Sequence, residues 1–529
     1  MPAHGPTVTL LNSASASRLA PAASRLAGIA VLAACALGWP GAAHSDITRP
    51  TTAGRSQGGQ LPTLGDGSEL GASAERRLGD RIAREIYRDP DYLDDPVLVE
   101  YVDAIWQPLL AAARSRGDIS PELDERFAWE IMLGRDRTIN AFALPGGYLG
   151  LHLGLIGVVT SRDELASVLA HELSHVTQRH ISRLMTKQSA QAPWVIGAMI
   201  LGALAASKSP ESASAVIAGG QAVAMQNQLN FSRDMEREAD RIGFGVLSQA
   251  GFAPQGFSAM FDKLQQAARL NDNGAFPYLR SHPLTTERIA DVQSRQPPGP
   301  ANPVLVDVAV DHAMVSARAR ILSNPGVDLL RYAVAESGVA GFGLLPVSRR
   351  AAVLYGATLA SSKLRDFGAA QASLAQLSEL TRSLPAAARL ARLLAAELAL
   401  QSGPARGVLS GAGRPELFLN SQTLVRAGRA GEAISDLQIW LARHPRDAGA
   451  WQLLAGACAA QGLSLRAIRA EAEAQVAQMD YAAALDRFKA AQTFMRTGPS
   501  ASIDHIEASI IDTRARAVQS LLREQALER

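Results

Sequence analysis

The sequence predicts a mainly α-helical chain in which a mixed α+β domain precedes a longer, all-helical region. Aromatic residues make up only 5% of the 529 residues, a composition that favours packed helices over β-sandwiches. Short β-like runs at 126–133 and 140–156 lie directly before a helix-forming stretch at 161–182. Beyond residue 304 the apolar periodicity is helical, and Ala and Leu dominate the composition.

Residues 1–45 have the pattern of a secretory signal peptide. Arg18 and Arg25 precede the apolar run 26–39, and small residues follow it. The run is shorter than the roughly 20 residues that a membrane-spanning helix requires. We therefore expect cleavage near residue 45 and export to the periplasm.

Cys35 allows a second interpretation of the same segment. The sequence Leu-Ala-Ala-Cys that ends at Cys35 resembles a lipobox, in which this cysteine would be lipidated and would anchor the mature chain. If residues 1–45 are removed instead, Cys458 is the one cysteine left in the sequence, which excludes an intramolecular disulfide and cysteine-rich zinc sites. Any metal site would then use histidines and carboxylates.

Composition divides the rest of the chain into four segments. Residues 46–74 are rich in Gly, Thr and Ser and are expected to form a flexible lead-in. Helical patterning with short strands follows at 75–295, and a linker rich in Pro and Gly lies at 296–304. Helical repeats are expected at 305–529.

The helix that contains His-Glu-Leu-Ser-His carries the first candidate metal ligands. Ser161 and Glu164 form a capping box at its start. His171 and His175 are four residues apart, so both imidazoles face one side of the helix and can bind one ion. Glu172 lies near the open position of such an ion, where it can take a proton from bound water. The alternative is that the histidines pack in the core or face solvent and that Glu172 is a surface carboxylate.

A second helix at 230–247 supplies a candidate third ligand. Glu236 and Asp240 are four residues apart and share one face. Glu236 would complete a zinc site of two histidines and one glutamate, and Asp240 would orient a ligating histidine through its second ring nitrogen. Glu238 is a rival ligand, but it faces a different side of the helix. The alternative is an exposed, charged helix.

Three motifs carry a family resemblance: H-E-L-S-H at 171–175, E-R-E-A-D at 236–240 and S-H-P-L-T-T-E-R at 281–288. Together they resemble the zinc metallopeptidases related to the CAAX prenyl protease and HtpX. The third motif matches the family's His-Pro pattern, which ends at Arg288. The resemblance implies a zincin-like α+β metallopeptidase domain at 75–295.

The same resemblance assigns roles to the candidate residues. It implies one Zn²⁺ per chain with three protein ligands, His171, His175 and Glu236. Glu172 would be the catalytic base and Asp240 a supporting acid. His282 would reach the site, either near the reacting carbonyl or as an extra ligand that keeps the enzyme latent.

The stretch 140–151 resembles the strand that precedes the catalytic helix in this family. There an edge strand binds extended substrate by backbone pairing, a mode that tolerates many sequences. Two further histidines lie close to these motifs in sequence. We expect His152 to be structural and His180 to lie at the surface.

The region 305–529 shows a period of 34 residues. Ala433 and Ala467 are 34 residues apart, and Trp451 and Pro445 occupy positions typical of a tetratricopeptide repeat. Small Ala side chains let paired helices approach closely, and each pair buries its face on the next. A generic Ala-rich helical bundle is the alternative. Stacked helix pairs would offer a surface for docking client or partner proteins.

Residues 192–225 contain two apolar segments separated by a polar stretch. Neither segment reaches the roughly 20 residues of a membrane-spanning helix. We expect an apolar helical flap beside the active site, which either packs in the core or makes peripheral contact with a membrane.

The residues and the resemblance together predict a periplasmic zinc endopeptidase with a repeat domain. This layout resembles that of periplasmic members of the family with chaperone-like activity. It implies unfolded or misassembled outer-membrane β-barrel proteins as substrates, and the β-barrel assembly machinery as a partner of the repeats. The alternative function is a chaperone-like assembly factor whose peptidase is mostly latent. No nucleic acid partner is expected, because the net charge is only +2.

Overall fold

In the computed structural model, all described residues belong to one compact unit. The described residues are 70–187, 232–269, 277–296, 310–323, 325–403, 407–497 and 504–527. The predicted signal peptide, most of the lead-in and the apolar segments at 192–225 lie outside them.

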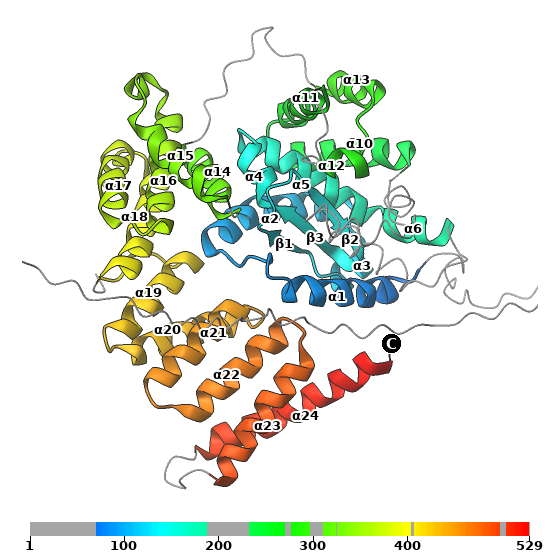
Figure 1. Ribbon diagram of the computed structural model, residues 1–529. Coiled ribbons are helices and arrows are strands. Elements are labelled where there is room, and N and C mark those ends of the chain that lie inside the picture. Colours follow the sequence, from blue (N-terminus) through cyan, green and yellow to red (C-terminus); the bar gives the residue numbers. More distant parts are fainter. Residues whose placement is uncertain are drawn as a thin grey trace, which may run out of the picture. The chain divides into compact units, whose positions relative to one another are not determined.

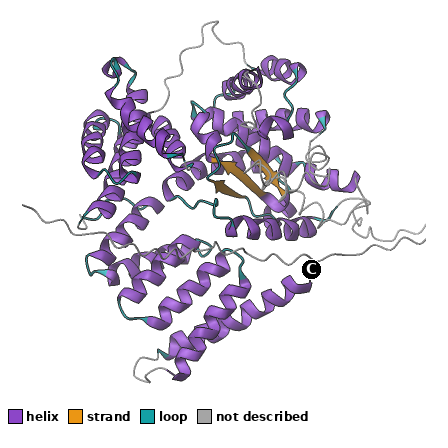
Figure 2. Cartoon of the chain, viewed as in Figure 1, coloured by secondary structure: helices purple, strands orange, loops and turns teal. Residues whose placement is uncertain are grey.

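A small sheet surrounded by helices forms the first part of this unit (Figures 1 and 2). Its elements in chain order are α1 (Ala72–Arg88), α2 (Pro96–Arg116), α3 (Pro121–Arg126), β1 (Glu130–Gly134), β2 (Ala141–Leu144), the 3-10 turn η1 (Pro145–Gly147), β3 (Tyr148–His152), α4 (Leu153–Val158), α5 (Arg162–Thr177), α6 (His180–Lys187), α10 (Arg233–Gln249), α11 (Gln255–Arg269), α12 (Pro277–Ser281) and α13 (Thr286–Arg295). The predicted combination of many helices with a small sheet is confirmed.

The sheet has the strand order β1-β3-β2, so β2 is an edge strand. β2 runs antiparallel to β3, with Ala143 opposite Leu149, whereas β1 is parallel to β3. The turn between β2 and β3 is tight, because Gly146 and Gly147 have φ angles of 73° and 85°, which favour glycine. A Cβ on Gly146 would lie only 2.8 Å from the Cα of Arg76 on α1. This turn fixes the hairpin that places β2 against α5.

Helix α5 packs against α2, α10, α11 and β2. Every side chain from Glu164 to Thr177 is buried. The Ser161 side chain caps the helix by accepting a hydrogen bond from the Glu164 amide at 3.1 Å. The Glu164 carboxylate accepts from the Thr160 amide at 2.8 Å, so the second half of the predicted capping box falls one residue earlier than expected. Because all its sides are covered, α5 holds its polar side chains away from solvent.

The second part of the unit is helical throughout its described residues. Its elements are α14 (Val310–Leu322), α15 (Val327–Ala335), the 3-10 turns η2 (Glu336–Gly338) and η3 (Phe342–Leu344), α16 (Val347–Lys363), α17 (Phe367–Thr381), α18 (Pro385–Ser402), α19 (Arg414–Arg426), α20 (Ala430–Arg443), α21 (Ala448–Ala460), α22 (Ser464–Ala477), α23 (Tyr481–Thr497) and α24 (His505–Leu527).

Successive helices of this part pack on one another, α20 on α21, α21 on α22 and α22 on α23. Helix α22 begins 34 residues after α20, which agrees with the predicted period. The Trp451 indole donates a hydrogen bond to the Pro445 carbonyl at 2.9 Å and so fixes the start of α21 against the preceding turn. The assignment of these helices to the tetratricopeptide class remains a prediction.

A buried arginine joins the two parts. Arg318 on α14 is 3% exposed, and its guanidinium lies 2.6 Å from Asp95 and 2.9 Å from Glu397 on α18. Asp95 is also the N-cap of α2, where its Oδ1 accepts from the Leu98 amide at 2.9 Å. One guanidinium therefore compensates two carboxylates and orients the start of α2 against the helical region.

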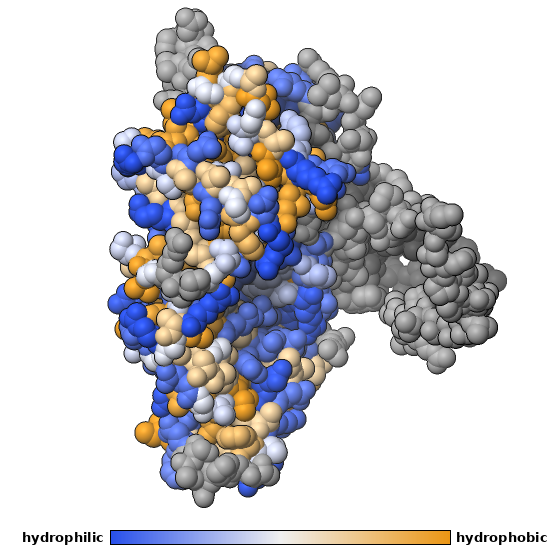
Figure 3. Space-filling view, turned by 60° about the vertical axis from the view of Figure 1, so that its left-hand side comes forward, coloured by the Kyte–Doolittle hydropathy of each residue, from blue (hydrophilic) through white to orange (hydrophobic). Residues whose placement is uncertain are grey.

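Hydrophobic side chains are exposed along α15 and the turns that follow it. Examples are Val327, Tyr332 and Leu344, which are 53%, 67% and 92% exposed. On the face drawn in Figure 3, hydrophobic residues in orange are interspersed with hydrophilic residues in blue. Among the described helices, none has the length and apolar character needed to cross a membrane.

Arg318→Met should lower the free energy of unfolding by about 3–5 kcal/mol, because it leaves Asp95 without its partner in a buried position. Urea denaturation followed by circular dichroism measures the change. The matched control is Arg331→Met, since Arg331 and Asp328 form a 3.8 Å pair with side chains 72% and 99% exposed. That variant should change stability by less than ~0.5 kcal/mol. Equal effects of the two substitutions would contradict the role given to Arg318.

Candidate active site

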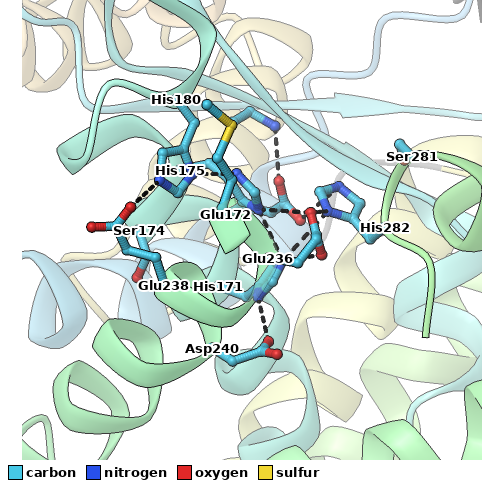
Figure 4. A network of polar contacts seen from close by, with 12 residues as sticks. His171, Glu172, Ser174, His175, His180, Glu236, Glu238, Asp240, Ser281 and His282 are labelled. Atoms are coloured by element: carbon cyan, nitrogen blue, oxygen red, sulfur yellow. Dashed lines mark hydrogen bonds and ion pairs between the residues drawn. The ribbon is translucent and has the colours of Figure 1, made fainter. Parts of the chain in front are cut away.

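Four buried side chains meet between α5 and α10 (Figure 4). His171 and His175 come from α5, Glu236 from α10, and His282 from the residue that follows α12. One nitrogen or oxygen from each lies within 4.8 Å of those of the others, and each side chain is at most 2% exposed. We refer to these four residues as the donor group. The helical spacing therefore brings the two α5 imidazoles together as predicted.

The distances within the donor group suit a single ion of the size of zinc. His171 Nε2 lies 3.0 Å from His175 Nε2 and 3.5 Å from Glu236 Oε2. His282 Nδ1 lies 3.4 Å from His171 Nε2 and 3.0 Å from Glu236 Oε1. Nitrogen and oxygen ligands of a tetrahedral zinc stand roughly 3.3–3.6 Å apart. The distances of 3.4 and 3.5 Å fall in this range, and the two distances of 3.0 Å are somewhat shorter. Imidazole and carboxylate together are also a donor set that zinc accepts.

The protonation states of His175 and Glu236 suit metal binding. Burial lowers the pKa of His175 well below its ordinary value, so the imidazole stays neutral, as a ligand must be. Burial acts to raise the pKa of Glu236, but the neighbouring rings of His282 and His171 outweigh it and lower this pKa well below its ordinary value. His175 and Glu236 thus offer a neutral nitrogen and an anionic oxygen. Burial acts to lower the pKa of His171, but its hydrogen bonds to Asp240 and Glu236 outweigh this and raise the pKa to about 10, so His171 would have to release a proton to bind a metal.

Glu172 lies beside the donor group without belonging to it. Its Oε2 accepts a hydrogen bond from the Ala143 amide on β2 at 2.9 Å, and its Oε1 lies 3.4 Å from His282 Nε2. Burial raises the pKa of the Glu172 carboxyl, and the rings of His282 and His171 oppose this shift. A carboxylate held in this way next to a metal site can act as a general base.

Asp240 and Arg288 support two members of the donor group from outside. Asp240 Oδ1 lies 2.9 Å from His171 Nδ1, the ring nitrogen that faces away from the group. Arg288 donates to both oxygens of Asp240, at 2.6 and 2.8 Å, and its Nη1 lies 2.8 Å from Glu236 Oε2. Burial acts against ionisation of Asp240, but Arg288 outweighs it and lowers the pKa of this carboxyl. One buried guanidinium therefore fixes both carboxylates.

His180 is buried, and the expectation that it lies at the surface is wrong. Helix α5 ends at Thr177, and Arg179 adopts a φ of 52°, so the chain turns sharply before His180 begins α6. The His180 side chain is 0% exposed, and its Nδ1 lies 2.9 Å from His175 Nδ1. The expectation assumed that the helix continued, whereas this turn brings the ring back to His175.

Two other residues take the positions that the sequence suggested. Glu238 faces a different side of α10 from the donor group, where it contacts His180 Nε2 at 3.1 Å and accepts from Arg183 at 2.9 Å. His152 is buried at the end of β3, and its Nδ1 lies 2.9 Å from the Thr138 hydroxyl. Neither contributes to the donor group.

Residues 109–296 match the model of Peptidase family M48. The chain is also 31% identical over 455 residues to the "Putative beta-barrel assembly-enhancing protease" of Vibrio cholerae serotype O1, which covers 83% of this chain and 89% of that relative. The chain belongs to peptidase family M48. All residues of the donor group lie within the part that matches the family.

Further relatives of this M48 peptidase agree on its class. It is 30% identical over 442 residues to the "Beta-barrel assembly-enhancing protease" of Escherichia coli strain K12, covering 80% of this chain and 86% of that relative. It is 32% identical over 172 residues to the "Mitochondrial metalloendopeptidase OMA1" of Schizosaccharomyces pombe, covering 32% and 47% respectively. The predicted enzyme class is confirmed: this M48 peptidase is a metalloendopeptidase.

The structure brings together the candidate site residues selected from the sequence, which are His171, Glu172, His175, Glu236, Asp240 and His282. It adds two residues to which the sequence analysis gave no role at the site, Arg288 and His180. For Arg288 a signal existed, since it closes the S-H-P-L-T-T-E-R motif. For His180 the sequence held no signal, because its position depends on the turn at Arg179.

Arg288→Lys should weaken metal binding by about 10–100-fold. The lysine ammonium cannot replace the planar guanidinium, which contacts Asp240 and Glu236 at the same time. Zinc affinity can be measured by competition with a chromophoric chelator. Arg241→Lys is the control, because Arg241 follows Asp240 on α10 and is exposed. Wild-type affinity in the Arg288 variant would contradict this role.

Proposed function

We propose that the chain is a zinc-dependent endopeptidase that hydrolyses peptide bonds of unfolded or misassembled proteins. The observation that carries this proposal is the buried donor group, in which His171, His175 and Glu236 are the proposed catalytic ligands, with the Glu172 carboxylate beside it. When bound there, zinc would polarise the scissile carbonyl and lower the pKa of the attacking water.

The proposed base is Glu172. It would take a proton from the attacking water and deliver it to the leaving amine. Its hydrogen bond to the Ala143 amide holds the carboxylate in place between β2 and the donor group. Asp240 and Arg288 would keep His171 and Glu236 in position during this cycle.

The proposed substrate site is the edge strand β2. Its position at the edge of the sheet leaves one side of the strand without a neighbouring strand among the described residues. An extended client segment that paired with β2 would place a peptide bond next to Glu172, which already contacts this strand. Backbone pairing would recognise unfolded chains with little regard to sequence.

The sequence and the names of the relatives support the proposed location and clients of the enzyme. Residues 1–45 support export to the periplasm, with lipid anchoring through Cys35 as the alternative. The relatives named beta-barrel assembly-enhancing protease support outer-membrane β-barrel proteins as clients. The helical repeats at 305–529 would dock clients or the assembly machinery, and residues 192–225 would contribute any peripheral membrane contact.

His282 favours a second candidate function, that of a chaperone-like assembly factor with a latent peptidase. A catalytic zinc site keeps one position open, whereas four protein ligands close it. His282 Nδ1 is the fourth donor, and its ring stacks on Tyr278 with ring centroids 4.6 Å apart. We infer that His282 acts as a latency ligand, which would have to leave before substrate enters.

Glu172→Gln should lower the cleavage rate of an unfolded outer-membrane β-barrel protein by ~10²–10⁴-fold, because the amide cannot take up a proton. Fold and zinc content should be unchanged, as shown by circular dichroism and metal analysis. Glu125→Gln, at an exposed position on α3, is the control and should cleave normally. Full activity of the zinc-loaded Glu172 variant would refute its assignment as the base.

His282→Ala should raise the cleavage rate about tenfold, since a closed state stabilised by only ~1.4 kcal/mol accounts for that factor. Rates are compared at equal zinc content. A loss of activity as deep as that of Glu172→Gln would instead assign His282 to the reacting carbonyl.

The two functions can be separated in cells that lack the chromosomal gene. The assembly-factor function requires that a stable, exported Glu172→Gln protein still supports assembly of its clients. If this variant fails as completely as the deletion, the assembly-factor function is excluded and the peptidase carries the activity.

A further inference from the structure

We propose that His180 and Glu238 form a line of hydrogen bonds outside the donor group, which positions His175 and strengthens its binding of metal. This inference rests on the metal site of the proposed function, and it gives a role to a turn and an acidic residue outside the donor group. His180 is a positioning residue in this account, because it acts through His175.

The contacts run outward from the donor group in one line (Figure 4). His175 presents Nε2 to the group, 3.0 Å from His171 Nε2, and turns Nδ1 toward His180 Nδ1 at 2.9 Å. His180 Nε2 lies 3.1 Å from Glu238 Oε2, which also accepts from Arg183 at 2.9 Å. The two imidazoles meet edge to face with ring centroids 4.9 Å apart.

Metal binding by His175 determines which ring nitrogen carries the proton in both His175 and His180. A His175 that gives its Nε2 lone pair to a metal keeps its one proton on Nδ1, so Nδ1 must donate. His180 Nδ1 must then accept, which places the His180 proton on Nε2, where it is donated to Glu238. A metal-bound His175 therefore needs an acceptor at the position of His180 Nδ1, and the structure provides one.

The two α5 ligands are thus supported in parallel but unequal ways. His171 faces the Asp240 carboxylate directly, and that carboxylate is held by Arg288. His175 reaches the Glu238 carboxylate only through the neutral ring of His180. Both carboxylates belong to α10, so this helix supports both ligands in addition to supplying Glu236.

A strained turn holds His180 in place. Arg179, at a φ of 52°, directs its guanidinium to Glu75 on α1 at 3.1 Å, and Glu75 is 2% exposed. A positive φ is unusual for an arginine. A local conformation that costs energy and is stabilised by a distant helix is expected where it serves a site.

The test is the zinc affinity and zinc release rate of the purified full chain, measured with a chromophoric chelator. His180→Leu fills the same space without an acceptor and should bind zinc about 10–100-fold more weakly. His180→Asn places an amide oxygen near the position of Nδ1 and should restore affinity to within about threefold of wild type. His312→Leu is the control, since His312 is also buried, at 1% exposure, but bonds to Tyr101 instead.

The outcomes distinguish this inference from the proposed function. Wild-type affinity and release rate in a folded His180→Leu would overturn the inference and leave the metal site standing. His180→Asn as weak as His180→Leu would also overturn it, because packing alone would then explain the loss. If wild type binds no zinc, the proposed function itself fails.

A second variant covers the case in which His180→Leu does not fold. Glu238 is 29% exposed in its side chain, so Glu238→Ala should fold. Its loss leaves the His180 proton without a carboxylate acceptor, and zinc should be released about threefold to tenfold faster. An unchanged release rate would overturn the proposal.

Discussion

Charge compensation in a buried place is the constraint on which this peptidase domain depends. Imidazoles and a carboxylate that are to share one ion must lie a few ångströms apart, away from solvent, where unpaired charges are costly. The surrounding elements place charged or polar partners beside Glu236, His171 and His175. Arg288 holds Glu236 and Asp240, Asp240 contacts His171, and His180 contacts His175. Residues Glu164–Thr177 of α5 can be buried because these contacts replace the hydrogen bonds that water would make to the polar side chains.

Helix α10 shows how a short acidic motif serves this constraint. Its residues Glu236, Glu238 and Asp240 look alike in sequence, but each has a different neighbour. Glu236 belongs to the donor group, and Asp240 faces His171. Glu238 is the last residue in the line of hydrogen bonds that runs from His175 through His180. One helix therefore supplies a proposed ligand and two supporting carboxylates. The close approach of α10 to α5 depends on Gly243, where a Cβ would lie 3.0 Å from the Ala170 carbonyl oxygen.

The parts of the site that follow helical periodicity could be predicted from the sequence. The pairs His171 with His175 and Glu236 with Asp240 are each four residues apart, which fixes them on one face of a helix. His180 could not be placed, because its position depends on the turn at Arg179, whose side chain pairs with Glu75 on another helix. The ion pairs of Arg318 could not be predicted either, because Asp95 and Glu397 lie far from Arg318 in sequence. The small sheet was predictable from the short β-like runs at 126–133 and 140–156, but its strand order was not.

We propose that His171, His175 and Glu236, with His282 in the closed state, bind one zinc ion. X-ray absorption at the zinc edge of the purified chain tests it most directly. We expect one zinc per chain with nitrogen and oxygen ligands at about 2.0–2.2 Å, scattering from at least two imidazoles, and four-coordination. A sulfur ligand at about 2.3 Å, a six-coordinate oxygen shell or a signal without imidazole scattering would contradict the account.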